Sequence, residues 1–194
     1  MIRARGLGRS FGTKLVVREV DIDLPRGGFL LVTGPNGSGK TTLLRLAAGL
    51  LVPTAGEIEV GSTRDRIGFL GHEPLVYREL TAIENLDLYG RLYRIAERRE
   101  RIGMLLERFG LWDVRNQRAE SFSRGMLQRL SLCRTILHDP ELLILDEPFS
   151  ALDDEGAALL DRELADLRPH RTFLLATHDP DRLAQLSTAR LAFT

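Results

Sequence analysis

Three short, almost uninterrupted apolar runs set the strongest limit on how this 194-residue chain can fold. They cover residues 29–33, 142–145 and 172–177. Runs of this length are typical of strands that are buried on both faces of a parallel sheet. Helical patterns, with apolar residues recurring at intervals of three and four, occur over 40–50, 81–93, 98–109, 126–137 and 153–167. Strands that alternate with helices predict an α/β protein with crossovers over a mainly parallel sheet.

The remaining patterns predict how the rest of the chain is organised. Residues 15–24 alternate apolar with charged side chains, which indicates a strand with one face in water. The segment 81–118 carries successive helical patterns without a strand pattern, so we expect a helical lobe, about 74–120, inserted into the sheet domain. Its hinges are expected near Glu73–Pro74 and Glu120–Ser121. The length suits one substantial core, and we predict a single domain over 1–194.

The composition disfavours several classes of protein. The 27 Lys and Arg residues balance 27 Asp and Glu residues, so no net positive charge attracts nucleic acid or anionic lipid. The apolar runs are far shorter than the roughly 20 residues that cross a bilayer. The one cysteine, Cys133, can form no disulfide within the chain, and we expect a buried apolar side chain there. These features predict a cytoplasmic protein without a membrane span of its own.

A phosphate-binding loop follows the first apolar run. Residues 34–41 match the pattern G-x-x-x-x-G-K-[ST] and lie between the predicted strand 29–33 and the predicted helix 40–50. Its glycines let successive N–H groups and the helix N-terminus converge on anionic oxygens. Lys40 adds a positive charge near the β- and γ-phosphates, and the Thr41 hydroxyl suits Mg²⁺. The residues expected to bind the nucleotide here are Gly34, Pro35, Asn36, Gly37, Ser38, Gly39, Lys40, Thr41 and Thr42.

Two acidic residues end the second apolar run. The run 142–145 is followed directly by Asp146 and Glu147. We expect Asp146 to reach the coordination shell of Mg²⁺, and Glu147 to orient and polarise the water that attacks the γ-phosphate. The alternative for Glu147 is a solvated or helix-capping carboxylate. Together with the loop and its lysine, this pair predicts a nucleotide-hydrolysing site.

Residues 123–129 read S-R-G-M-L-Q-R and lie at the start of a helical pattern. This segment resembles the signature loop of the ATP-binding subunits of ABC transporters, and the resemblance covers nearly the whole chain. It implies a P-loop NTPase fold of the ABC type, with a mainly parallel sheet core, an antiparallel β portion and the inserted helical lobe. It also implies an ATPase whose hydrolysis is coupled to transport.

Further site residues follow from this resemblance alone. Ser123 and Gly125 would bind the γ-phosphate held by an opposing subunit, so that ATP joins a homodimer as a sandwich. Asp153 would lie in the loop that couples the two sites. His178 would contact the γ-phosphate and help hold the attacking water, and Phe11 would stack on adenine. For Ser123 the alternative is a plain helix N-cap, and Asp179–Pro180 would start a further helix.

The chain departs from the family pattern at two loops. His72 stands where relatives usually carry a glutamine that approaches Mg²⁺, and its neighbour Glu73 is the better oxygen donor for that ion. Which of the two serves the metal stays open. Arg124 and Met126 replace the first glycine and the glutamine of the usual signature, so the donor set around Ser123 differs from the common one.

Within the family, the segment 79–86 and the S-R-G-M form of the signature resemble CcmA, the ATPase of the haem exporter used in cytochrome c maturation. That resemblance implies ATP and Mg²⁺ as cofactors, membrane subunits like CcmB and CcmC as partners, and a place on the inner face of the cell membrane. Efflux ATPases for drugs, antibiotics or lipids are the first alternative. A soluble ABC ATPase acting on nucleic acid is the alternative of another class, which the compact lobe and neutral charge disfavour.

Overall fold

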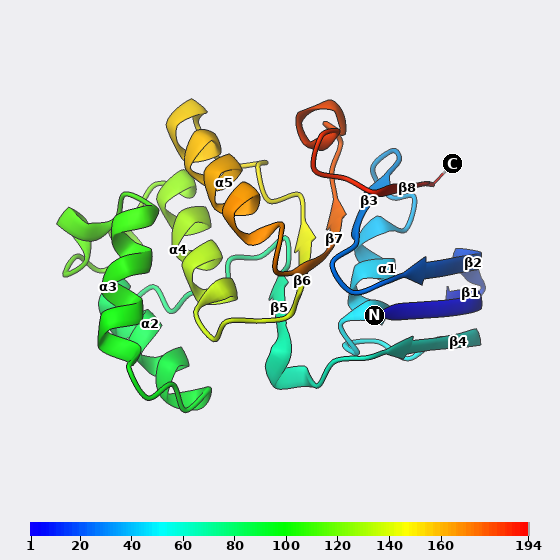
Figure 1. Cartoon of the computed structure of the whole chain (residues 1–194), viewed down its shortest axis with the longest axis horizontal. Helices are drawn as coiled ribbons and strands as arrows, with labels where there is room; N and C mark the ends of the chain where they lie inside the picture. The colour runs from blue at the N-terminus through cyan, green and yellow to red at the C-terminus, as the bar shows by residue number, and fades with distance from the viewer. Residues whose placement is uncertain (194) are drawn as a thin grey trace.

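The three apolar runs form neighbouring strands of one sheet. In the computed structural model, which describes residues 1–193, they are β3 (Phe29–Thr33), β6 (Leu142–Asp146) and β7 (Thr172–Ala176). Two strands that were not predicted, β5 (Ile67–Leu70) and β8 (Ala189–Ala192), complete the sheet. The strand order is β5-β6-β7-β3-β8 and every pairing is parallel, as Figure 1 shows at the centre of the molecule.

A second, antiparallel sheet lies beside the first. It has the order β2-β1-β4 and consists of β1 (Ile2–Phe11), β2 (Lys14–Leu24) and β4 (Ala55–Val60). Strand β2 agrees with the alternating pattern over 15–24, whereas β1 and β4 were not located from the sequence. A parallel core with an antiparallel β portion confirms the predicted fold class (Figure 1).

The continuous apolar runs arise because both faces of the parallel sheet are buried. Leu31 and Phe29 of β3 belong to a core shared with the helices α2 to α5, whereas Leu30 and Val32 point to a second core. That second core also contains residues of α1 and of the antiparallel sheet. Because successive strand residues point to opposite faces, apolar residues are favoured at nearly every position of such a strand.

The helices lie where the sequence patterns predicted them. They are α1 (Lys40–Ala47), α2 (Ala82–Leu92), α3 (Arg98–Arg108), α4 (Arg124–Ile136) and α5 (Asp154–Leu167). Helix α1 ends earlier than predicted because Gly49 takes a left-handed conformation, with φ of 66°. The helix expected after Asp179–Pro180 is a single 3₁₀ turn, Asp181–Leu183, so that prediction was wrong. Other short 3₁₀ turns cover Arg64–Arg66, Trp112–Val114 and Ala119–Ser121.

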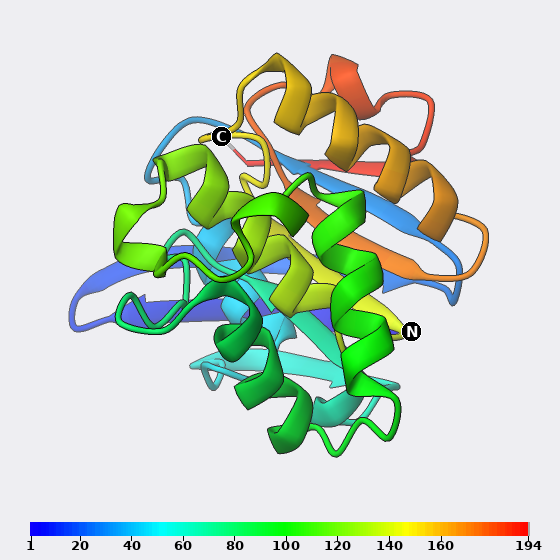
Figure 2. The same ribbon diagram turned by 90° about the vertical axis from the view of Figure 1, so that its left-hand side faces the viewer.

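The helical lobe is closed at its base by backbone hydrogen bonds. Thr81 and Arg118 form an isolated antiparallel bridge, and the Ala119 N–H donates to the Leu80 carbonyl at 2.9 Å. Close by, the Glu120 N–H donates to the Arg78 carbonyl at 2.8 Å. In Figure 2 the lobe helices lie in front of the two sheets. The two ends of the lobe therefore leave the sheet domain side by side.

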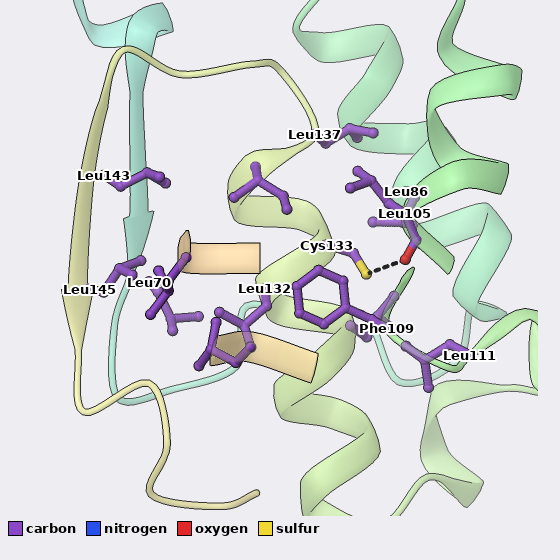
Figure 3. Close-up of a cluster of buried hydrophobic side chains, with 14 of the residues drawn as sticks. Leu70, Leu86, Leu105, Phe109, Leu111, Leu132, Cys133, Leu137, Leu143 and Leu145 are labelled. Carbon is purple, nitrogen blue, oxygen red and sulfur yellow. Dashed lines mark hydrogen bonds between the residues drawn. The ribbon is translucent and has the colours of Figure 1, made fainter. Parts of the chain in front are cut away.

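The lobe and the sheet share one hydrophobic core. Leu70, Leu143 and Leu145 of the sheet belong to the same buried cluster as Leu105 and Phe109 of the lobe. Figure 3 shows how α4 lies between these two groups and joins them. The lobe therefore packs as part of the domain and does not enclose a separate core.

The lone cysteine lies inside this core. Cys133 is fully buried, and its thiol donates a weak hydrogen bond to the Leu105 carbonyl at 3.6 Å (Figure 3). Burial raises the pKa of the Cys133 thiol, which keeps it protonated. Its expected role as a buried apolar side chain is confirmed. Among residues 1–193, no helix combines the length and the hydropathy required to cross a bilayer.

Candidate active site

The ends of four parallel strands converge on the phosphate loop. Strands β5, β6, β7 and β3 are consecutive neighbours, so their carboxyl ends share one edge of the sheet (Figure 1). His72 follows β5, Asp146 ends β6, His178 follows β7 and Gly34 follows β3. A pocket of about 290 Å³ opens at this edge and is lined by Val16, Asn36, Gly37, Gly39, Lys40, Thr41, Thr42, His72, Asp146 and Glu147.

The phosphate loop follows a path that glycines allow. Gly34 and Gly39 have φ values of 142° and 113°, in a region that side chains disfavour. A Cβ on Gly34 would lie 2.6 Å from the Phe193 carbonyl oxygen, and one on Gly39 would lie 2.7 Å from that of Val16. The hydroxyl oxygen of Ser38 is buried without a hydrogen-bond partner among residues 1–193. The loop is therefore tightly curved, and its Ser38 hydroxyl is free to donate a hydrogen bond. Both features fit a bound phosphate.

Lys40 extends along the inside of this loop. Its Nζ donates to the carbonyl oxygens of Gly34 at 2.7 Å and Pro35 at 3.1 Å. The same ammonium lies 3.9 Å from Oε1 of Glu147, and only 6% of the residue is exposed. The loop therefore holds a nearly buried positive charge at the mouth of the pocket.

Thr41 and Asp146 form the polar centre of the pocket. The Thr41 hydroxyl donates to Oδ2 of Asp146 at 2.7 Å, and Asp146 is 4% exposed. Burial raises the pKa of Asp146, and the charge of Glu147 raises it further, whereas the Thr41 hydrogen bond lowers it. Hydroxyl and carboxylate oxygens are the donors that Mg²⁺ prefers, with water and phosphate oxygens filling its remaining positions. The donor set therefore fits Mg²⁺.

Glu147 lies between Lys40 and His178. Its Oε2 accepts hydrogen bonds from the backbone N–H of His178 at 3.1 Å, and lies 2.8 Å from the ring Nδ1 of that residue. Glu147 has a φ of 48°, which is strained for a residue with a side chain. In this conformation the carboxylate lies beside Lys40 of the phosphate loop, while the Glu147 N–H donates to the Ala176 carbonyl of β7.

His72 and Glu73 differ in their relation to the pocket. The side chain of His72 lines it, and the charge of His72 lowers the pKa of Asp146, although its effect is smaller than that of burial. Glu73 is exposed and is not among the lining residues. The His72 imidazole therefore lies at the pocket, and the Glu73 carboxylate does not. The sequence alone had left both residues open as the one that serves the metal.

The signature segment and the loop before α5 lie outside the lining of this pocket. The hydroxyl of Ser123 caps α4 by accepting from the Met126 N–H at 3.2 Å, and a carboxylate oxygen of Asp153 caps α5 by accepting from the Gly156 N–H at 2.8 Å. Both caps are exposed, and Gly125 lies in the first turn of α4. Ser123 and Asp153 are therefore helix caps in this structure, at positions open to solvent.

Phe11 has an exposed ring at the end of β1. The ring is 46% exposed and lies 4.7 Å from the guanidinium carbon of Arg9, in a cation–π contact. It does not line the 290 Å³ pocket. An exposed aromatic ring leaves room for a planar ligand to stack on it.

Sequence reasoning missed two residues that shape the loop. Val16 lines the pocket, and its carbonyl touches Gly39. Phe193 donates its N–H to the Thr33 carbonyl at 2.8 Å, and its backbone lies against Gly34. Val16 stands near a break in the alternation of β2, which gave a weak signal, and the short strand before Phe193 gave none.

The comparisons with known proteins agree with this geometry. A family model described as "ABC transporter" matches residues 17–150, which include the phosphate loop, the signature segment and the Asp146–Glu147 pair. The chain belongs to the ABC transporter family of ATP-binding domains. It is therefore an ATP-binding, ATP-hydrolysing domain of that family.

The curated relatives of this ABC domain carry several different names. An uncharacterized ABC transporter ATP-binding protein YxlF of Bacillus subtilis is 39% identical over 92% of this chain and 62% of its own length. A daunorubicin resistance ATP-binding protein of Streptomyces coeruleorubidus is 40% identical over 81% of this chain and 53% of its own. The cytochrome c biogenesis ATP-binding export protein CcmA of Pseudomonas putida is 38% identical over 91% of this chain and 89% of its own length. This chain thus spans little more than half the length of some relatives.

Solved structures of ABC cassettes have the same fold as this domain. One, a dimeric ATP-binding cassette in a post-hydrolysis state bound to ADP and Pi, superimposes with a TM-score of 0.90 at 25% identity. The match covers 100% of this chain and 94% of that one. A further dimeric structure of a bacterial ABC transporter cassette gives a TM-score of 0.88 at 26% identity.

Proposed function

We propose that this ABC domain is the ATP-hydrolysing subunit of a transporter and that it powers a membrane partner. One observation carries the catalytic part of this proposal. The Glu147 carboxylate lies between the Lys40 ammonium and His178, at the mouth of a phosphate loop. A base held there can take a proton from water while the neighbouring cation and backbone N–H groups balance the charge of the phosphates.

The chemistry assigns a different task to each residue. Glu147 accepts a proton from the attacking water, whose oxygen bonds to the γ-phosphorus as the bond to the bridging oxygen breaks, giving ADP and phosphate. Lys40 and the loop N–H groups hold the β- and γ-phosphate oxygens. His178 orients the Glu147 carboxylate and contacts the γ-phosphate with its largely exposed ring.

Thr41 and Asp146 would hold a Mg²⁺ ion through oxygen atoms, with His72 beside them. When bound, that ion neutralises phosphate charge. Glu73 would coordinate the ion only after a conformational change of residues 72–74. Phe11 would stack on adenine.

The site is completed by a second copy in this proposal. Ser123 and Gly125 lie at the exposed N-terminus of α4, where N–H groups and the helix dipole favour an anion. A partner copy would present its γ-phosphate there, while Asp153 lies in the adjoining loop. The dimeric state named for the related cassette supports this arrangement.

The membrane partner would dock in an apolar groove beside the lobe. The groove has a volume of about 260 Å³, and its apolar lining includes Leu50, Ile67, Phe69, Leu75 and Tyr93. Leu50 and Leu75 are 58% and 52% exposed, which suits a short apolar helix of the partner. Leu75 follows His72 by three residues, so the same segment reaches both the groove and the active site.

We propose haem export in cytochrome c maturation as the transport function, with CcmB- and CcmC-like partners. The CcmA relative supports this because the match covers most of both chains. Drug efflux is the second candidate, supported by the daunorubicin resistance relative of similar identity. Recovery of the native complex and identification of its membrane subunit by mass spectrometry would decide between the two. A permease whose ATP turnover rises with anthracycline and not with haem would contradict haem export.

The substitution Glu147→Gln tests the catalytic proposal. It keeps the size of the side chain and removes the base, so ATP turnover should fall by about 100-fold or more while ATP binding persists. An ATP-dependent dimer should then accumulate on a sizing column. Glu107→Gln, at an exposed position on α3, is the matched control and should keep full turnover. Retained turnover in Glu147→Gln would remove Glu147 from the mechanism.

A further inference from the structure

A buried glutamine connects the signature helix to the catalytic loop. Gln128 lies in the second turn of α4 and is 7% exposed. Its side-chain Nε2 donates to the carbonyl oxygen of Pro148 at 3.0 Å. Buried amides are costly unless they are hydrogen-bonded, so this bond constrains both of its partners. Pro148 directly follows Glu147 in the chain.

The loop that receives this bond has few other anchors. Between residues 147 and 152 it contains two short-range backbone bonds, from the Ser150 N–H to the Glu147 carbonyl and from the Leu152 N–H to the Phe149 carbonyl, both at 3.1 Å. Within the part of the chain that the structure describes, no backbone N–H donates to the Pro148 carbonyl. Pro148 itself has no N–H to offer. The Gln128 amide therefore anchors the loop right after the strained Glu147 backbone.

A second contact joins the same two segments. The Ala151 carbonyl oxygen would lie 3.2 Å from a Cβ placed on Gly125, so the loop lies close against the first turn of α4. Ser123 caps that same turn. The N-terminal end of α4 and the Glu147 loop consequently form one contiguous unit, in contact at Gly125 and hydrogen-bonded at Gln128.

We propose that Gln128 is a positioning residue that couples the N-terminus of α4 to the Glu147 carboxylate. It transmits any movement at Ser123, where the other copy is to bind, to the base of the same chain's own site. Its hydrogen bond to Pro148 holds Glu147 in the left-handed conformation from which its carboxylate reaches His178. This inference rests on the proposed role of Glu147 as the base.

Two substitutions separate this role from simple packing. Gln128→Leu replaces the amide with an apolar side chain of similar size and removes the donor, so kcat should fall about five- to tenfold, the loss typical of one hydrogen bond, with KM for ATP unchanged. Gln128→Glu can donate to Pro148 only when its carboxyl is protonated, and burial favours that protonated form at reduced pH. Its kcat, divided by that of the wild type at the same pH, should therefore rise as pH is lowered from about 8 to about 6.

The experiment measures steady-state ATP hydrolysis of the full chain, or of its native complex, between these pH values. Gln117→Glu is the matched control, because Gln117 is exposed on the lobe, and its ratio should stay near one. Thermal unfolding checks that each variant is folded. If Gln128→Leu is too unstable to assay, Gln128→Glu still tests the proposal. A folded Gln128→Leu variant with the kcat of the wild type would overturn the proposal, and so would a Gln128→Glu ratio that stays low down to pH 6. Wild-type chain without turnover would instead count against the proposed function itself.

Discussion

At the scale of one residue, the buried carboxylate of Asp146 lowers the stability of the fold while it serves the site. It is almost fully buried beside Glu147, and among residues 1–193 only the Thr41 hydroxyl donates a hydrogen bond to its side chain. Burial raises its pKa, so the folded chain retains this proton at a higher pH than the unfolded chain does. Ionised Asp146 therefore costs stability above the folded pKa, and this cost disappears below the unfolded value of about 3.9.

The substitution Asp146→Asn should stabilise the fold while stopping Mg²⁺-dependent turnover. An amide oxygen can still accept from Thr41, and the buried negative charge is gone. Thermal unfolding at neutral pH should show a rise in Tm of about 2–4 °C, the change that roughly 1 kcal/mol produces in a domain of this size.

The gain should shrink as pH is lowered toward about 4, because wild-type Asp146 then becomes protonated as well. Asp113→Asn, at an exposed position on the lobe, serves as the control and should leave Tm nearly unchanged. An equal gain at every pH would contradict the electrostatic explanation.

At the scale of elements, the N-terminus of α4 has two separable roles. Ser123 caps the helix, and the proposed dimer also requires this end to accept a phosphate. Aspartate is as good an N-cap as serine, but its charge repels phosphate. A substitution can therefore keep the first role and remove the second.

Ser123→Asp should preserve stability and abolish the ATP-dependent dimer, whereas Ser123→Ala should lose about 1 kcal/mol of stability through the missing cap. Both are best made in the Glu147→Gln background and followed by thermal unfolding and sizing with ATP. If Ser123→Asp dimerises as well as its parent, Ser123 is only a cap.

The other elements differ in how clearly the sequence indicated them. The patterns of α2, α3 and α5 gave bounds within one residue of the observed ones, because each helix has a local apolar stripe. Strand β1 gave no clear signal, since bulges interrupt its register with β2 between Ala4 and Ser10. Strand β8 is short and mostly exposed. Pairing with a neighbour, and not local preference, makes such strands.

At the scale of the whole molecule, the shared core makes the lobe and sheet depend on each other. Phe109 of the lobe is 1% exposed and belongs to the cluster that contains Leu143 and Leu145 of β6. Because one core serves both parts, we expect them to unfold in a single transition. The only tryptophan, Trp112, lies in the lobe and reports on it separately.

Phe109→Ala should destabilise the whole domain by about 3–5 kcal/mol, as large-to-small changes in a core do. Chemical unfolding followed by Trp112 fluorescence and by circular dichroism should show coincident transitions, both shifted to lower denaturant. Leu92→Ala, at a site that is 67% exposed, is the control and should have little effect. An earlier fluorescence transition would mean that the lobe unfolds independently.

The sequence by itself determined the parallel strands β3, β6 and β7, the main helices and the phosphate loop, because apolar periodicity and glycine spacing are local properties of the chain. Only the tertiary structure decided that β7 lies between β6 and β3, which brings Glu147 and His178 together at the loop. It also chose His72 over Glu73 as the pocket residue and placed Val16 there. These are contacts between segments distant in sequence, and they depend on strand order and packing, which no local pattern encodes.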